Sequence, residues 1–185
     1  MSVVLRVLAL DRRRWDQVSV MSIWPAMALV VAASVVLAWT RFGGLAVDAP
    51  RAFLRMVLVG VWGWLGLGAA IWLPARFLRA STGPADAQPA ASLERILAAA
   101  GFAHGPVLLL GLVVLVAAGA MQIFGLGEIV AVVVFGFWFP ALLVAAGSST
   151  FDLDPVRAVG VVALPYGLWL VVVGRYLLEQ VQHLL

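Results

Sequence analysis

The sequence predicts an all-α polytopic membrane protein: a single membrane domain, residues 1–185, that forms a bundle of five transmembrane helices with short amphipathic interfacial helices. The composition is the first reason, because 64% of the residues are hydrophobic, only 11% are charged and the mean hydropathy is +1.09. A soluble domain carries roughly 25% charged residues, and a fold of this size has too little polar surface to cover so many apolar side chains. The second reason is a series of five apolar stretches, each about 20 residues long, which is the length that a helix needs to cross a bilayer.

The N-terminal segment, residues 1–18, is predicted to lie at the membrane interface. Its apolar residues are followed by a cluster of basic and aromatic side chains, Arg12, Arg13, Arg14 and Trp15. A helix here would place the arginines at lipid phosphates and the tryptophan at the headgroup level. These four residues are therefore lipid-headgroup candidates, although a basic flank that only sets the topology fits the same pattern.

The first two spans are predicted at 20–39 and 53–73. The second is rich in glycine, and Gly66 and Ala70 form a pair of small residues four positions apart. Such surfaces let another helix approach closely. The polar, Pro- and Gly-containing residues 74–91 are expected to form a flexible connection.

Residues 92–103 predict an amphipathic surface helix with Ser92 as its N-cap. The helix leads through a short hinge into the third span, 106–124. The hinge contains small residues, a proline and a histidine, which are candidates for bending or interaction: Gly101, His104, Gly105 and Pro106.

The fourth and fifth spans are predicted at 128–147 and 158–178, and a very short turn between spans three and four makes those two an antiparallel hairpin. Pro140 and Pro165 should kink their helices, and neighbouring groups should satisfy the backbone carbonyl that loses its donor. A polar loop, 148–154, separates the two spans. Asp154 followed by Pro155 predicts the start of the last helix.

The arginines set the expected orientation. With five spans, eight arginines fall on the side of the N-terminus and four on the other side: Arg6, Arg12, Arg13, Arg14, Arg76, Arg79, Arg95 and Arg157 against Arg41, Arg51, Arg55 and Arg175. The positive-inside rule then predicts a cytoplasmic N-terminus and an exoplasmic C-terminus in the cytoplasmic membrane. Arginine without any lysine also favours a bacterial source with a GC-rich genome.

The sequence offers no catalytic constellation, and we expect a protein that is not an enzyme and has no cofactor and no metal site. No charged residue or histidine falls in the central turns of a predicted span, which disfavours proton-coupled transport. His104 has no second ligand nearby, so a structural role is favoured over metal binding or pH sensing. Asp152 and Asp154 are best explained as capping and loop residues. The arginines border apolar segments, so nucleic acid is not an expected partner.

The segment SLERILAAAGFAHGPVLLLG resembles the characteristic segment of the Yip-domain family, the Ypt-interacting-protein membrane proteins, in which a helix leads through a proline hinge into the third span. RVLALDRRRWDQVS is similar to the opening of bacterial members, except that Asp11 replaces an expected proline, and PVRAVGVVALPYGLWLVV also fits. The resemblance implies a five-span protein. Eukaryotic members are linked to Rab-type GTPases through a longer N-terminal region, so the short segment before the first span argues against that partner here.

Three functions are compatible with these features. The favoured one is a scaffold, adaptor or membrane-organising factor of the Yip-domain type, with membrane lipids and a membrane-protein partner or second copy as its contacts. The alternatives are a small oligomeric transporter, channel or lipid-moving protein, and an accessory subunit of a larger membrane complex. A cavity open to lipid or water beside the Gly-rich second span and the Pro-kinked last spans would favour transport.

Overall fold

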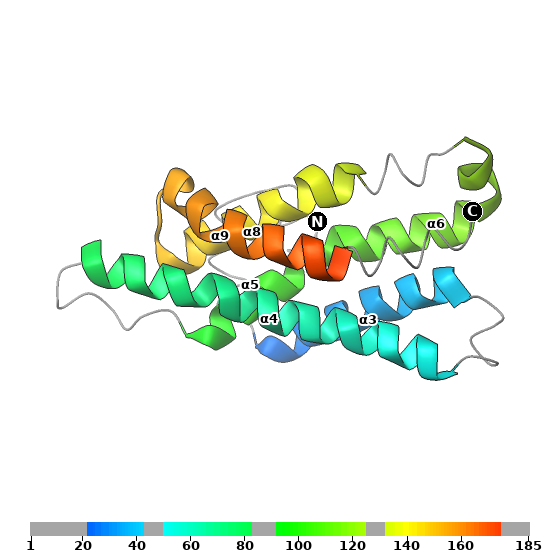
Figure 1. Ribbon diagram of the computed structural model, residues 1–185, viewed down its shortest axis with the longest axis horizontal. Coiled ribbons are helices and arrows are strands. Elements are labelled where there is room, and N and C mark those ends of the chain that lie inside the picture. Colours follow the sequence, from blue (N-terminus) through cyan, green and yellow to red (C-terminus); the bar gives the residue numbers. More distant parts are fainter. Residues whose placement is uncertain (1–21, 43–49, 83–91, 125–131, 175–185) are drawn as a thin grey trace.

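A computed structural model describes residues 22–42, 50–82, 92–124 and 132–174, and the elements within these ranges are all helical. They are α3 (Ile23–Phe42), α4 (Pro50–Thr82), α5 (Leu93–Phe102), α6 (Gly105–Phe124), the π-helical turn η2 (Val134–Trp138), α8 (Phe139–Phe151), α9 (Pro155–Trp169) and a second π-helical turn, η3 (Leu170–Gly174). The predicted all-α class is confirmed for this part of the chain. Successive rods (α3, α4, α5–α6, η2–α8 and α9–η3) run in alternating directions along the long axis of the molecule (Figure 1).

Four helical stretches among the described residues are long and apolar enough to cross a membrane, which makes this a membrane protein by length and composition. They are Pro50–Leu78, Leu93–Val116, Val134–Phe151 and Pro155–Val173. The predicted count of five is not confirmed, because the apolar part of α3, Ile23–Trp39, is shorter. At 1.5 Å per residue it measures roughly 26 Å, whereas the hydrocarbon core is about 30 Å thick.

Helix α4 is longer than the predicted span, and the predicted connection is correspondingly shorter. The helix continues through Pro74 to Thr82, so residues 74–82 are not the flexible segment expected there, and residues 83–91 lie outside the described ranges. Pro74 removes only one backbone donor. Ala75 is fully buried and the Arg76 guanidinium lies 5.1 Å from the centre of the Trp72 ring, so contacts on both sides of the proline hold the last turns.

Helix α5 is buried, and the prediction of a surface helix is wrong for most of its length. The Ser92 N-cap is confirmed, because the Ser92 hydroxyl accepts a hydrogen bond from the Arg95 amide at 3.3 Å. Every residue from Ile96 to Phe102 is buried, however, and α5 packs against α3, α4 and α8. Small residues make this possible, since three alanines and Gly101 let neighbouring helices approach on all sides.

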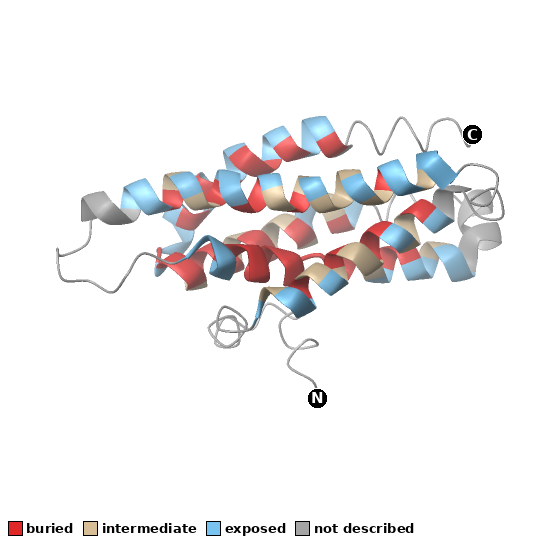
Figure 2. Ribbon diagram, turned by 90° about the horizontal axis from the view of Figure 1, so that it is seen from below, coloured by how far each residue is buried: buried red, intermediate tan, exposed pale blue. Residues whose placement is uncertain are grey.

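Two contacts fix α5 in place. The Trp64 indole N–H, on α4, donates to the Leu97 carbonyl oxygen at 2.9 Å. A Cβ atom placed on Gly101 would lie 2.6 Å from the Ala26 Cβ, so α3 and α5 touch closely at this glycine. Figure 2 shows the resulting pattern, in which buried residues follow the faces that helices turn toward one another.

The predicted irregularity at Pro140 takes the form of the π-helical turn η2. The Phe139 amide donates to the Val134 carbonyl, five residues back. In this register the next donor, residue 140, would serve the Phe135 carbonyl, but proline has no N–H. The Tyr166 hydroxyl, from α9, donates to that Phe135 oxygen instead. Tyr166 is thus the neighbour that satisfies the carbonyl orphaned by Pro140.

The connection between α8 and α9 is tighter than the predicted loop, because α8 continues to Phe151. Asp152 closes the helix in a left-handed conformation (φ 52°), which aspartate tolerates better than most residues. The buried Ser148 hydroxyl donates to the Leu153 carbonyl at 2.7 Å. Asp154 is the N-cap of α9, as predicted, and its carboxylate accepts from the amides of Val156 and Arg157, both at 3.1 Å.

We expect Asp154→Ala to lower the free energy of unfolding by about 0.5–2 kcal/mol, because two amides of the first turn of α9 lose their acceptor. Asp154→Asn retains a side-chain acceptor and is the matched control. The ion pair between Asp154 and Arg157 is exposed and contributes little. The measurement is thermal unfolding in detergent, and equal losses for both variants would show that the charge rather than the cap matters.

Candidate functional site

The predicted headgroup residues Arg12, Arg13, Arg14 and Trp15 lie outside the described ranges. The hinge candidates Gly101, His104, Gly105 and Pro106 are described, and all four are buried at the junction of α5 and α6. The interruption spans only one turn, because the amides of Ala103, His104 and Leu108 keep their helical-type bonds to carbonyls three or four residues back. Pro106 explains the break, since it lacks the N–H that a continuous helix would use there.

His104 makes structural contacts. Its Nδ1 donates to the Ala100 carbonyl at 2.8 Å, and its ring packs edge-on against Phe139, with centroids 4.9 Å apart. Within the described ranges, no group of three or more His, Cys, Asp or Glu residues could hold a metal ion. Beside His104 lies a small internal cavity of about 30 Å³, which also touches Ser34 and Trp169 and is large enough to hold a water molecule.

An aromatic cluster joins the hinge to the last helix. Phe139 lies at its centre, with its ring centroid 5.7 Å from that of Tyr166 and 5.5 Å from that of Trp169. Tyr166 and Trp169 stack on each other at 5.8 Å, and Phe135 completes the cluster. The cluster ties α8 and η2 to α9 by aromatic packing.

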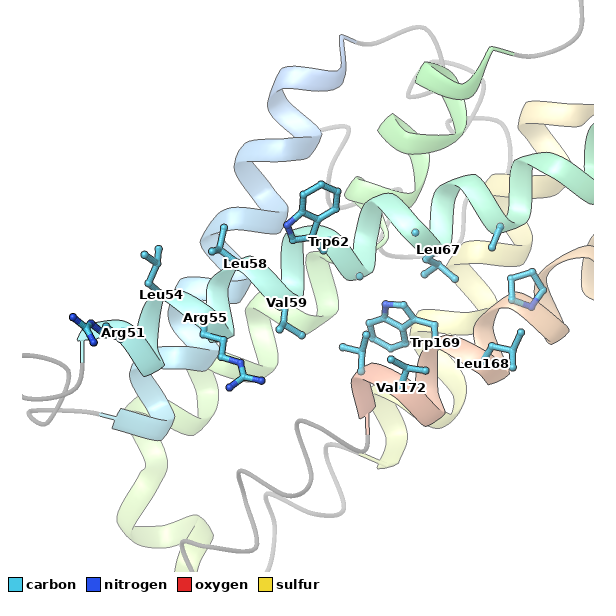
Figure 3. Close-up of a pocket in the computed structure, with 15 residues that line it drawn as sticks. Arg51, Leu54, Arg55, Leu58, Val59, Trp62, Leu67, Leu168, Trp169 and Val172 are labelled. Carbon is cyan, nitrogen blue, oxygen red and sulfur yellow. The ribbon is translucent and has the colours of Figure 1, made fainter.

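Trp169 lies between the internal cavity and a much larger groove on the surface of the bundle. This groove has a volume of about 730 Å³ and runs between α4 and the α9–η3 rod (Figure 3). Ligand sites in proteins commonly measure about 300–1,000 Å³, so the groove has the volume of a small-molecule site. It is open along its side, and apart from two arginines all its lining residues are apolar.

The groove exists because the α9–η3 rod covers the small residues of α4 at one position but leaves them uncovered one turn later. A Cβ atom on Gly63 would lie 3.0 Å from the Trp169 indole nitrogen and 3.1 Å from Val173, so the two rods touch there. A Cβ atom on Gly66 would meet nothing within 4 Å. Gly66 and Ala70 are exposed and line the groove.

Large apolar side chains form the walls of the groove. Trp62 and Leu58 stand on the α4 side, 69% and 46% exposed, and Leu168 and Val172 stand opposite, 60% and 70% exposed. Figure 3 shows Val59 and Leu67 on the side of α4 that faces Trp169, and Leu168 and Val172 on the opposite rod. Exposed apolar side chains that surround a hollow mark a binding site or a contact with lipid.

The groove carries positive charge at one end only. Arg51 and Arg55 lie one turn apart near the start of α4, and both line the groove. Figure 3 shows them beyond Leu58, at the end away from Leu67, with the Arg55 guanidinium extending toward the side of η3. None of the described lining residues is acidic. The groove therefore combines a long apolar surface with a cationic end.

The amino-acid sequence predicts the components of this site but not the groove that they form. The small residues of the second span predict a surface for close helix packing. This prediction is correct at Gly60, Gly63 and Gly68, where Ser34, Trp169 and Leu97 lie against them. It is incorrect at Gly66, which faces open space. Sequence patterning does not reveal which turn of a small-residue face remains uncovered.

No family model, no curated protein and no solved structure matches this chain. The resemblance to the Yip-domain family therefore stays a prediction.

Proposed function

We propose that this chain is a five-helix membrane protein that binds a membrane lipid, with the acyl chain of the lipid in the groove between α4 and the α9–η3 rod, and that it takes part in moving or distributing lipids. The observation that carries the proposal is the groove itself, which is apolar and opens sideways, toward the position that lipid occupies around a membrane-spanning bundle. A cavity of this kind beside the Gly-rich and Pro-containing helices is the feature expected of a lipid-moving protein rather than a scaffold. Pro165 contributes directly to its wall.

The burial of α5 also favours this function over a scaffold or adaptor role. That role would use two surfaces, the basic N-terminal segment, which lies outside the described ranges, and residues 92–103, of which only residues 92–95 are exposed. Since the segment from Ile96 onward is occupied by contacts within the chain, it offers little surface to a protein partner.

We further propose that α3 crosses the membrane as a short fifth span, with the N-terminus cytoplasmic and the C-terminus exoplasmic. The alternating directions of the five rods support this arrangement (Figure 1). Arg76, Arg95 and Arg157 lie at the end of the bundle opposite Arg51 and Arg55, since they fall near the C-terminus of α4 and the N-termini of α5 and α9. The positive-inside rule then places Arg51 and Arg55 on the exoplasmic side.

Gly66→Trp tests the lipid site, because the indole would project into the groove at a position where nothing else lies within 4 Å. We expect this variant to retain several-fold less phospholipid than the wild type when the protein is released from phosphatidylcholine nanodiscs and examined by native mass spectrometry. Gly160→Trp is the matched control, since Gly160 also faces open space but lies outside the groove. Equal lipid retention by both variants would refute the proposed function.

A further inference from the structure

We propose that the small cavity beside His104 is a binding site for a water molecule, which joins the Trp169 indole N–H to the Ser34 hydroxyl and to the Nε2 atom of His104. The three side chains belong to α9, to α3 and to the junction of α5 and α6. All three are buried and line the cavity. The bound molecule would therefore link three separate parts of the bundle, independently of any lipid in the groove.

The first argument is the indole N–H of Trp169. This side chain is only 9% exposed, and its Nε1 atom has no hydrogen-bond partner in the described part of the chain. A buried donor without a partner is costly and uncommon in folded proteins. The buried Trp64 indole, by contrast, donates to the Leu97 carbonyl at 2.9 Å. Trp169 therefore needs an acceptor, and a water molecule in the adjoining cavity can supply one.

The other two polar groups complete the hydrogen bonding of such a water molecule. Because Nδ1 of His104 donates to the Ala100 carbonyl, Nε2 is the acceptor of the neutral imidazole. The Ser34 hydroxyl can both donate and accept. A water molecule that accepts from the indole retains two O–H groups, which can donate to Nε2 and to the serine oxygen. It would then make three hydrogen bonds, the usual number for a buried water molecule.

Two glycines place the serine and the indole on the same side of α4. A Cβ atom on Gly60 would overlap the Ser34 Oγ atom, and a Cβ atom on Gly63 would lie 3.0 Å from the Trp169 Nε1 atom. The Cβ positions of residues three apart on a helix are about 5–6 Å from each other. Two hydrogen bonds of about 2.9 Å that share one oxygen atom span a similar distance. A single water molecule can therefore reach both groups.

The size and charge of the cavity determine the class of ligand. Its volume of about 30 Å³ has room for a water molecule, whereas pockets for organic ligands commonly measure about 300–1,000 Å³. The described lining residues include no carboxylate that would balance a metal cation and no arginine or lysine that would balance an anion. The ligand is therefore a small neutral molecule that both donates and accepts hydrogen bonds.

The test is nuclear magnetic resonance of the full-length protein in detergent micelles, with isotope-labelled indole nitrogens assigned through bonds to their own backbones. We expect the indole proton of Trp169 to show a dipolar cross-peak to water in a rotating-frame Overhauser spectrum. The Trp64 indole is the matched control within the same sample. It is 1% exposed and already donates to a carbonyl, so it should show no such cross-peak.

A pair of variants tests the bridge itself. In Ser34→Ala the water cross-peak of Trp169 should fall several-fold, because the water molecule loses one of its three partners. Ser22→Ala, at the start of the same rod and outside the cavity lining, should leave the cross-peak unchanged.

The comparison of the two indoles uses only the wild type and does not depend on the folding of any variant. Absence of a water cross-peak at Trp169 would mean a dry cavity and would overturn the proposal. Equal cross-peaks at Trp169 and Trp64 would overturn it as well, because the contact with water would not be specific. A cross-peak that Ser34→Ala leaves undiminished would refute the bridge. None of these outcomes depends on whether the groove binds lipid.

Discussion

Replacing Gly101 with alanine is expected to destabilise the protein by about 1–3 kcal/mol, the usual cost of overpacking a tight interior. The new methyl group would lie 2.6 Å from the Ala26 Cβ and 3.1 Å from the Ala26 carbonyl carbon and oxygen. Because two of these three atoms belong to the backbone, α3 and α5 must move apart to admit it. Gly101→Leu should have a larger effect and prevent recovery of folded protein.

The control for Gly101→Ala is Gly160→Ala, which is expected to change the stability in the opposite direction. Alanine in a helix is preferred over glycine by about 1 kcal/mol, and at Gly160 the added methyl group meets nothing within 4 Å. Gly160→Ala should therefore leave the melting temperature in detergent unchanged or raise it, whereas Gly101→Ala should lower it. If both variants melt at the same temperature, α3 and α5 are not in close contact at residue 101.

Tyr166→Phe is expected to cost about 1–3 kcal/mol, because the Phe135 carbonyl would remain in an apolar setting without a donor. The hydroxyl of Tyr166 is the donor that the structure gives this oxygen, and Pro140 cannot supply one. The substitution removes a single oxygen atom, so the packing of the ring against Phe139 and Trp169 should be preserved. Thermal unfolding in detergent again provides the measurement.

A double-mutant cycle with Pro140→Ala separates the hydrogen bond from other effects of the tyrosine. Alanine at position 140 restores an N–H that can serve the Phe135 carbonyl in the π-helical register. We therefore expect Tyr166→Phe to cost less in the Pro140→Ala background than in the wild type, with a coupling energy of about 0.5–3 kcal/mol, as for contacting residues. Additive effects would contradict the assignment of Tyr166 as the substitute donor.

Local signals in the sequence were sufficient for two helix N-caps and for the perturbation at Pro140. Ser92 and Asp154 cap the helices that they were predicted to cap, since a side-chain acceptor before an apolar run acts over three residues. The perturbation at Pro140 also follows from one missing N–H. The identity of Tyr166 as the compensating donor does not, because the two residues are far apart in the chain and meet only when α8 and α9 pack.

Properties that depend on how the helices pack against one another are harder to predict from the sequence. The alanines of α5 are compatible with a surface helix and with a buried one, and only the close neighbours α3, α4 and α8 decide between them. The 17-residue apolar part of α3 shows the same difficulty for membrane topology, because hydropathy identifies it and its length falls short of the other four stretches. The groove also depends on packing, since it is the space between α4 and the α9–η3 rod.

The aromatic cluster has a mechanical consequence for that space. Rings from η2, α8 and α9 interlock around Phe139, so these elements form one stiff block. The α4 wall carries glycine where it touches this block, at Gly63, and no side chain of its own obstructs sliding there. Any change in the width of the groove would therefore be a displacement of α4 against an undeformed block, with the contact between Gly63 and Trp169 as its pivot.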